Sequence, residues 1–349
     1  MEEKYTISKV ASIFGITTNK IRFYEKKGLI SPVHDDDSGY RYYEKNDILK
    51  LQSILLYRSI GIPLEEISNI LNSSDRINYL NHFNNQWTII NDEISRLTSI
   101  RASLEGILDK LYDSTSESIT DNSLLNEIMH FNEINKIKNN WHDRWNFNSW
   151  ASTYDADVKR DPGSLKIYKN YTEILRKVYE KTVALKIKKP SILEIGVGTG
   201  NLAGQFLNMD CKITGIDQSR EMLMEAKKKF PSLKVRLGEF LKIPMADNSI
   251  DVIISTYAFH HLNSKEKTIA VTEMLRVLKK NGHIIIGDLM FESEEKKQQL
   301  FKTLSNDEIA AIEDEYYSDV SLLKEEFTKH NRTLKYEQID RLNFIIQVY

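Results

Sequence analysis

The sequence predicts a chain of several domains: a small, mostly helical head, one long helix with a coiled-coil pattern, and an α/β domain built on a mostly parallel sheet. Three observations lead to this prediction. Two short amphipathic segments flank a glycine near the start, apolar residues recur in steps of three and four over residues 77–111, and a glycine-rich turn follows a strand pattern near residue 195. At 349 residues the chain is also too long for one ordinary domain.

The composition is that of a globular protein, with 41% hydrophobic and 28% charged residues and a net charge of −2. We expect a cytoplasmic protein, because no run approaches the ~18 apolar residues of a membrane span and the start, "MEEKYTISKV", lacks the apolar core of a signal peptide. The single cysteine, Cys211, excludes an intramolecular disulfide. A zinc site would need histidine or carboxylate ligands instead, and no metal site is predicted.

Residues 6–27 have the pattern of two short helices around a tight turn. Thr6 is a good N-cap for the first helix, Gly15 supplies the turn, and Thr17 can cap the second helix. Positions 17–27 carry four basic residues and one acidic residue. Such a surface suits a helix that reads base edges while its flanks hold phosphates, although a helical hairpin with a solvated polar face would look the same.

The segment after this hairpin favours the DNA-binding interpretation. A turn at Asp37-Ser38-Gly39 precedes a short aromatic ribbon, or wing, in which Arg41 can contact phosphates and the tyrosines can pack against the sugar backbone. The segments "TISKVASIFGITTNKIRFYEKKGLISP", "SGYRYY" and "LQSILLYRSIGIPLEEI" occur in the order typical of one family. Over about the first 72 residues the chain resembles the MerR family of transcription regulators.

This resemblance implies an all-α winged helix-turn-helix domain over residues 1–72. It also implies a dimer that binds a palindromic promoter in double-stranded DNA and changes promoter activity by distorting the DNA. The residues that would lie in the major groove are Thr17, Thr18, Lys20 and Arg22. Those that would hold phosphates are Tyr24, Arg41 and Tyr42.

An apolar seam runs through residues 77–111. It is narrow and sustained across about five heptads, which suits a coiled coil. MerR-like proteins dimerise through such a helix, so residues 73–113 are predicted to form the dimerisation helix of a homodimer. Packing along the chain's own next domain is the alternative. Residues 114–140 are predicted as a linker, and the cysteines that metal-sensing MerR proteins carry near this helix are absent.

The segment "PSILEIGVGTGNLAGQFL" predicts a strand, a glycine turn and a helix, and a second strand ends at Asp217, twenty-three residues after Glu194. This unit holds adenosine-containing cofactors, with the terminal acid accepting hydrogen bonds from ribose hydroxyls. The dinucleotide pattern G-x-G-x-x-G/A fits only if it is started at Gly198. The strand ends near Ile195, so the first glycine of the turn is Gly196, and from there the pattern fails.

Counted from the strand's end, the turn is E-x-G-x-G-x-G, filled by Glu194, Gly196, Gly198 and Gly200. A carboxylate at this place would repel a pyrophosphate, whereas it can engage an ammonium group. The predicted cofactor is therefore S-adenosyl-L-methionine, which carries an ammonium and a sulfonium and no phosphate.

Further strand patterns end near Gly238 and Ser255, and "VTEMLRVLKKNGHIIIGDLMF" predicts a helix, an Asn281-Gly282 turn and a fifth strand. With "LEIGVGTGN", "GEF" and "FHHL", these segments resemble class I methyltransferases of the small-molecule type over residues 141–349. The resemblance implies an α/β Rossmann-like domain with a seven-stranded, mostly parallel sheet whose last strand is antiparallel.

The resemblance also assigns cofactor contacts. Glu239, where the family usually has Asp, would bond the adenine amino group, and Tyr154 in the lid segment "WASTYD" would lie near the methionine moiety. The predicted cofactor-binding residues are Tyr154, Glu194, Gly196, Gly198, Gly200, Asp217, Gln218, Glu239, Phe240 and Ser255.

Two candidate catalytic residues, His260 and His261, follow the fourth strand at the edge where ligands bind. Methyl transfer depends mainly on alignment, but a general base helps when the acceptor is a hydroxyl, an amine or an acidic carbon. Either histidine can be that base; shaping the pocket or bonding the backbone is the alternative. Asp288 and Tyr257 are further candidates. DNA methylation is not predicted, because the proline-aromatic motif of amino-directed enzymes is absent and Cys211 precedes the second strand.

Two functions stay open. In the first, a DNA-binding regulator is joined to a working methyltransferase that acts on a small-molecule acceptor. In the second, the methyltransferase fold is a non-catalytic sensor that binds the cofactor or a metabolite and thereby controls DNA binding. The aromatic cluster at residues 141–150 either lines the acceptor site or packs the domain against its linker.

Overall fold

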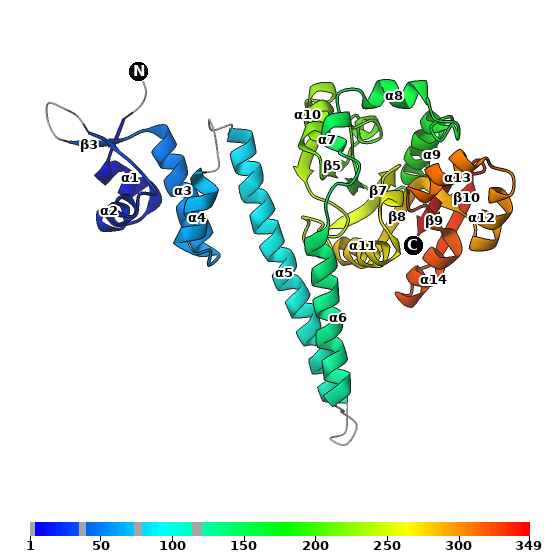
Figure 1. The fold of residues 1–349 in the computed structure, drawn as a ribbon, viewed down its shortest axis with the longest axis horizontal. Coiled ribbons are helices and arrows are strands. Elements are labelled where there is room, and N and C mark those ends of the chain that lie inside the picture. Colours follow the sequence, from blue (N-terminus) through cyan, green and yellow to red (C-terminus); the bar gives the residue numbers. More distant parts are fainter. Residues whose placement is uncertain (1–3, 35–39, 73–78, 114–120) are drawn as a thin grey trace. The chain divides into compact units, whose positions relative to one another are not determined.

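Two compact units make up the chain, and they meet inside the long helix α5 (Tyr79–Asp113), between Ile94 and Ser95 (Figure 1). The computed structural model describes the following residues: 4–34, 40–72, 79–113 and 121–349. Within these ranges, no helix has the length and apolar character needed to cross a membrane.

The first unit contains a helix-turn-helix and a small sheet. Its elements are β1 (Tyr5–Thr6), α1 (Ile7–Phe14), α2 (Thr18–Lys26), β2 (Val33–His34), β3 (Arg41–Tyr43), α3 (Lys45–Ser59) and α4 (Leu64–Asn72). The predicted caps are confirmed: the Thr6 hydroxyl accepts from the Lys9 amide, the Thr17 hydroxyl accepts from the Lys20 amide, and Gly15 ends α1 at φ +62°. These caps satisfy helix-end groups that would otherwise lack partners.

The head is not all-helical, because three strands form an antiparallel sheet in the order β1-β3-β2. The ribbon of β2 and β3 is the predicted wing, whereas β1 was not predicted because two residues are too few to show an alternating pattern. The predicted turn at residues 37–39 lies outside the described residues.

The first half of α5 packs against α3. Gln86 is buried and exchanges hydrogen bonds of 3.2 and 2.8 Å with Gln52, and its amide donates to the Ser53 hydroxyl at 2.9 Å. Ile89 adds an apolar contact with the core of the unit. This part of the helix therefore belongs to the head.

The second unit is built on a mostly parallel sheet. Its strands are β4 (Ser191–Ile195), β5 (Lys212–Asp217), β6 (Lys234–Leu237), β7 (Ile250–Thr256), β8 (Leu278–Phe291), β9 (Ser318–Asp319), β10 (Leu334–Gln338) and β11 (Asn343–Val348). Seven of them run in the order β10-β11-β8-β7-β4-β5-β6, and β9 pairs with β8 beside this path. Strand β11 is antiparallel to both neighbours. The predicted seven-stranded sheet with an antiparallel last strand is confirmed, and β9 is an addition.

Helices cover both faces of this sheet. They are α6 (Asp121–Asn140), α7 (Phe147–Trp150), α8 (Tyr154–Arg160), α9 (Tyr171–Ala184), α10 (Arg220–Lys229), α11 (Ser264–Val277), α12 (Glu294–Phe301), α13 (Asn306–Glu313) and α14 (Val320–Lys329), with the 3₁₀ turns η1 (Ala203–Phe206) and η2 (Phe259–His261). Ile286 of β8 packs in the core with α11 and α14, whereas the next residue, Gly287, faces Ile174 and Val178 of α9. Because successive strand residues point to opposite faces, α9 lies across the sheet from α11.

The structure differs from prediction at two places, after the glycine turn and at Asn281-Gly282. The helix predicted after the glycine turn is only the 3₁₀ turn η1, because Gly200 and Gly204 lower the helix propensity and a Cβ on Gly204 would lie 2.4 Å from the Phe230 ring. Gly282 and its neighbour Asn281 lie inside β8 rather than in a turn. The register of β8 on β7 shifts there, so these residues form a bulge.

A further helix, α6, occupies residues 121–140 of the predicted linker. It lies beside the second half of α5 (Figure 1), and two ion pairs attach it to α11: Lys138 with Glu273 at 3.3 Å, and Lys265 with Glu133 at 2.6 Å. Its apolar residues recur in helical steps at Ile128, Phe131 and Ile134, a signal that the polar start of the segment obscured.

Candidate functional site

A pocket opens at the carboxyl ends of β4, β5 and β7, where ligands bind in sheets of this kind. It encloses about 610 Å³, part of it open to solvent. Its lining residues are Trp141, Phe147, Tyr154, Ile195, Gly196, Gly198, Asp217, Gln218, Met222, Gly238, Glu239, Phe240, Thr256, Tyr257, Ala258, His261 and Leu262.

The glycine turn forms one wall of the pocket. Gly196, Gly198 and Gly200 all have positive φ, and a Cβ on Gly196 would lie 2.4 Å from the Cβ of Ala258. Only glycine lets the two backbones approach so closely.

Beneath the turn, Glu194 is buried, and burial raises the pKa of its carboxyl well above the usual value. Among the described residues, its Oε2 has no hydrogen-bond partner. A buried acceptor without a partner is costly, so this oxygen indicates a ligand that donates a proton or carries positive charge.

Asp217, at the end of β5, links the glycine turn to the start of α10 through two hydrogen bonds. One carboxylate oxygen accepts from the Gly198 amide at 2.8 Å and the other from the Ser219 amide at 2.9 Å. Burial raises the pKa of Asp217 to about 6. Beside it, the Gln218 side-chain oxygen accepts from the indole of Trp141 at 3.1 Å. This corner presents acceptors for hydroxyl groups next to an aromatic ring.

The far end of the pocket carries Glu239 and Phe240. Burial raises the pKa of Glu239 to about 7, and its carboxylate accepts a hydrogen bond from the Leu241 amide. The side chain therefore takes up a proton near neutral pH, which lets it serve a ligand amine either as an acceptor or as a donor.

The predicted lid segment contacts the glycine turn. The Tyr154 ring lines the pocket and lies 4.9 Å from that of Trp150, and Asp155 accepts from the Thr199 hydroxyl at 2.7 Å and the Asn201 amide at 2.9 Å. A cation, Lys229, also bonds Asp155. The segment is therefore fastened to the loop that it covers.

The two candidate histidines have different environments. His260 is buried and does not line the pocket; its Nδ1 lies 2.5 Å from Asp288, whose other oxygen accepts from the His260 amide. Burial lowers the pKa of His260, but Asp288 outweighs this and the net pKa is raised. His261 lines the pocket, its Nδ1 lies 2.9 Å from Glu315, and burial lowers its pKa. Of the two histidines, only His261 lines the pocket.

Seven of the ten predicted cofactor residues line this pocket; Glu194 lies beneath the glycine turn, and Ser255 does not line the pocket. It is fully buried, and its hydroxyl donates to the Ile195 carbonyl at 2.7 Å, so it braces β7 against β4. Gly200 does not line the pocket either; because it has no Cβ, Phe230 and Leu233 can pack closely against the turn. Several lining residues were not predicted as cofactor contacts, because apolar and small side chains carry no chemical signature: Met222, Thr256, Ala258 and Leu262.

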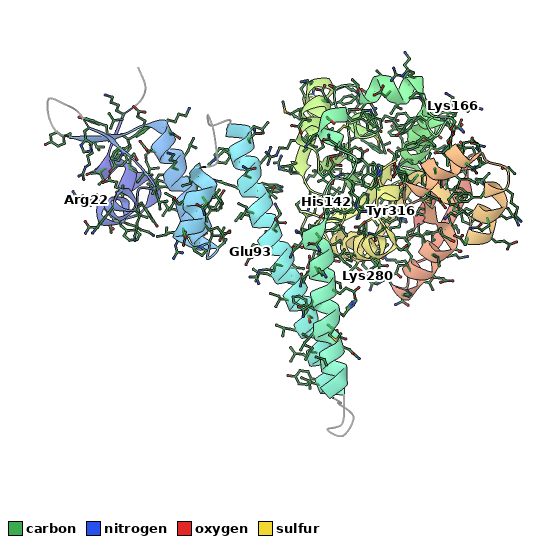
Figure 2. The ribbon with its side chains drawn as sticks, viewed as in Figure 1. Arg22, Glu93, His142, Lys166, Lys280 and Tyr316 are labelled. Carbon is green, nitrogen blue, oxygen red and sulfur yellow. The ribbon has the colours of Figure 1, made fainter. Side chains whose placement is uncertain are left out.

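In the head, the predicted DNA-binding residues do not all share one surface. Thr17, Lys20 and Arg22 are exposed (Figure 2 labels Arg22), and Thr18 is half-buried. Tyr24 is only 3% exposed and packs in the core, because its position in α2 points inward. Its neighbour Phe23 is exposed in its place.

The wing residues lie beside α2. Arg41 is exposed and pairs with Glu25 at 3.5 Å, and Tyr42 is half-buried with the Lys4 ammonium 5.8 Å from its ring. Tyr43 is buried and donates from its hydroxyl to Glu25. Glu25 therefore ties the wing to α2 and offsets part of the local positive charge.

Comparison with known proteins places the second unit in a family. Residues 193–286 match the family model for a methyltransferase domain. An uncharacterized methyltransferase of Oceanobacillus iheyensis is 37% identical over 209 residues, which cover 57% of this chain and 93% of that protein. The chain belongs to this methyltransferase family. A second methyltransferase of the family, from Bacillus cytotoxicus, is 34% identical and is covered over 94% of its length by 58% of this chain.

The methyltransferase domain has solved structural neighbours at low identity. One is a complex of DhpI with SAM and HEP, 14% identical, covering 58% of this chain and 94% of that one at a TM-score of 0.45. Another is magnesium protoporphyrin IX methyltransferase from Synechocystis with bound SAH, 12% identical, covering 59% and 99% at a TM-score of 0.46.

The head of this methyltransferase matches a second model. Residues 5–74 match the MerR HTH family of regulatory proteins. The chain therefore joins a MerR-type DNA-binding domain to a methyltransferase domain, and the relatives above correspond only to the second of these.

Proposed function

We propose that the protein is a DNA-binding transcriptional regulator whose methyltransferase domain uses S-adenosyl-L-methionine to methylate a small molecule. The observation that carries the cofactor assignment is Glu194, a buried carboxyl with an unpartnered oxygen beneath a turn of three glycines. A cationic cofactor without phosphate suits this charge, and a dinucleotide does not.

The residues of the pocket fit such a cofactor. Glu194 would meet the ammonium end, Asp217 and Gln218 the ribose hydroxyls, and Glu239 the adenine amine, with Tyr154 over the methionine moiety. The cofactor supplies an activated methyl carbon, so these residues mainly bind and orient. The aromatic rings of Trp141 and Phe147 in the lining favour an apolar acceptor over a highly charged one.

Two measurements on the full-length protein separate an enzyme from a sensor. Isothermal titration with S-adenosyl-L-methionine tests cofactor binding, and transfer of a radiolabelled methyl group to a metabolite extract tests turnover. Both signals support the enzyme. Binding without transfer across a broad acceptor panel would favour the sensor, in which the ligand only controls DNA binding. Absence of binding would contradict the cofactor assignment itself.

Cofactor affinity is expected to fall as the pH is lowered from 7.5 to 5.5. The pKa of Asp217 is raised by burial to about 6, so its proton is present in the folded protein below that pH and lost above it. Asp217 is therefore fully ionised, and free to accept from ribose hydroxyls, only at the higher pH. Its titration alone should change the cofactor affinity about fourfold between the two pH values.

This pH dependence is checked by titration calorimetry at both pH values. Asp217→Asn should bind more weakly and lose that part of the pH dependence, whereas Asp314→Asn, at an exposed position, should keep it. The same pKa shift means that the contribution of Asp217 to folding stability falls as the pH rises from about 4 to about 6, because the unfolded chain loses its proton first. A pH-independent wild-type affinity would contradict the placement of Asp217 at the ribose.

For the head, we propose binding to a palindromic promoter through α2 and the wing. Arg22→Ala is expected to weaken operator binding by about 10- to 100-fold, as removal of a base-contacting arginine costs about 1–3 kcal/mol. A gel-shift titration at moderate salt measures the effect. Lys50→Ala removes the same charge from α3 and should change the affinity much less. Equal affinities of Arg22→Ala and wild type would rule out this placement of α2.

We also propose that the protein is a homodimer held by α5. Apolar side chains on this helix are about half exposed, between 44 and 54%: Leu80, Phe83, Ile94, Leu97, Leu104, Leu108 and Leu111. Such a stripe on one long helix suits a partner helix of a second copy. The predicted Ile77 of the same seam lies outside the described residues.

A further inference from the structure

Three side chains with metal-ligating atoms meet at the wall of the pocket. They are His260 and His261, which end η2, and Glu315, which follows α13. One potential ligand atom from each lies within 4.8 Å of the other two. Since His261 also lines the pocket, an ion held by this cluster would lie at the pocket wall.

Each ligand is held in position by its surroundings. The Tyr316 amide donates to the His260 carbonyl at 3.0 Å, which fixes the neighbouring Glu315 beside the histidines (Figure 2 labels Tyr316). Asp288 takes the Nδ1 side of His260 at 2.5 Å, so that the free lone pair of the neutral ring is on Nε2. A carboxylate behind a ligating histidine is the usual support of such a ligand.

The distances suit a small ion. Glu315 Oε2 lies 2.9 Å from His261 Nδ1 and 4.0 Å from His260 Nε2. Tetrahedral Zn²⁺ with bonds of about 2.0–2.2 Å separates its ligand atoms by roughly 3.4 Å, so each of these two separations would change by less than about 1 Å on binding.

The charge of the site also favours a cation. Two carboxylates, Asp288 and Glu315, face the two imidazoles in a largely buried setting. The nearby cation, Lys267, is directed at the Leu262 and Tyr316 carbonyls and offsets only one of the two charges. A buried excess of negative charge is stabilised by a bound cation.

We propose that His260 Nε2, His261 Nδ1 and Glu315 Oε2 bind one divalent transition-metal ion of the Zn²⁺ type. Two imidazoles and one carboxylate are the ligand set of a Zn²⁺ site with an open position. The open position would take a hydroxyl or thiol of the methyl acceptor and lower its pKa, so that its proton leaves to water. The two histidines would then share the role of holding the ion in place of a single general base. This assignment of the acceptor rests on the proposed methyltransferase function, whereas ion binding itself does not. No metal site was predicted from the sequence, and the proposed site replaces that prediction.

Titration of the metal-free, full-length protein with Co²⁺ tests the site, because Co²⁺ bound by nitrogen and oxygen ligands absorbs visible light. We expect one equivalent to bind and one equivalent of Zn²⁺ to displace it. Glu315→Gln and His261→Asn should each weaken binding at least ~10-fold. The matched controls are Glu313→Gln and His142→Asn, exposed residues outside the cluster, which should bind as wild type does (Figure 2 labels His142).

The outcomes are distinct. If Glu315→Gln and His261→Asn bind Co²⁺ as tightly as wild type, or if several equivalents bind alike, the proposed site is wrong. Circular dichroism of each variant shows whether it folds, and the conservative changes at Glu315 and His261 leave the buried His260–Asp288 pair intact. Calorimetry with S-adenosyl-L-methionine in the presence of EDTA measures cofactor binding separately. The proposed ion site and the proposed cofactor site can therefore be refuted independently.

Discussion

Replacing Gly196 by alanine is expected to abolish binding of S-adenosyl-L-methionine. The added Cβ would lie 2.4 Å from the Ala258 Cβ, and the residue holds φ at +71°, which side chains rarely adopt. Both Gly196 and Ala258 line the pocket, so any movement that relieves the clash changes the cavity. Strain of this kind costs about 1–3 kcal/mol, and displacement of the turn adds to it, so we expect affinity to fall at least ~100-fold by calorimetry.

Gly163→Ala is the matched control for this change. Gly163 lies in the same unit, a Cβ there would meet no atom within 4 Å, and its φ is not in the left-handed region. Radiolabelled methyl transfer, if present in the wild type, should be lost in Gly196→Arg and kept in Gly163→Ala. Full cofactor affinity in Gly196→Ala would mean that the cofactor does not touch this turn.

The second large effect is expected from Leu104→Glu in α5. Leu104 is 54% exposed in the middle of the apolar seam, and a carboxylate buried between two helices is costly. If the seam joins two copies, the variant should elute as a monomer by light scattering at micromolar concentration. Operator affinity should then fall by more than ~100-fold, because each half-site would have to be bound separately.

Leu322→Glu makes the same substitution at another exposed leucine, on α14, and should leave both mass and operator affinity unchanged. A dimeric Leu104→Glu protein with wild-type DNA binding would refute the helix-mediated dimer. Circular dichroism shows whether each variant is folded; the polar contacts of α5 with α3 and with Asp247 do not involve either substituted leucine.

The elements with strong local signals were predictable from the sequence. Thr6, Gly15 and Thr17 mark the two head helices because capping chemistry is local, and β4, the strand before the glycine turn, is rich in apolar residues. Strand β1 and helix α6 were missed for different reasons. The first depends on pairing with β3, a contact distant in sequence, and the second begins with polar residues.

Site residues were predictable where the function requires an unusual residue type. They were not predictable where tertiary packing determines which side chain faces the pocket. The glycine turn and Asp217 could be recognised from spacing alone. Ser255 could not be told from its neighbour Thr256, because only the register of β7 decides which side chain faces the pocket. The different roles of the two histidines depend on Asp288 and Glu315, which lie 28 and 54 residues away in sequence.

The double hydrogen bond of Asp217 has a spectroscopic consequence. The Gly198 and Ser219 amide protons both point at one carboxylate that is also placed to meet a ligand. Their NMR chemical shifts should move together with pH near 6, and their hydrogen-exchange rates should slow when the pocket fills. These two amides can therefore report occupancy of the pocket without any acceptor, reaction or label.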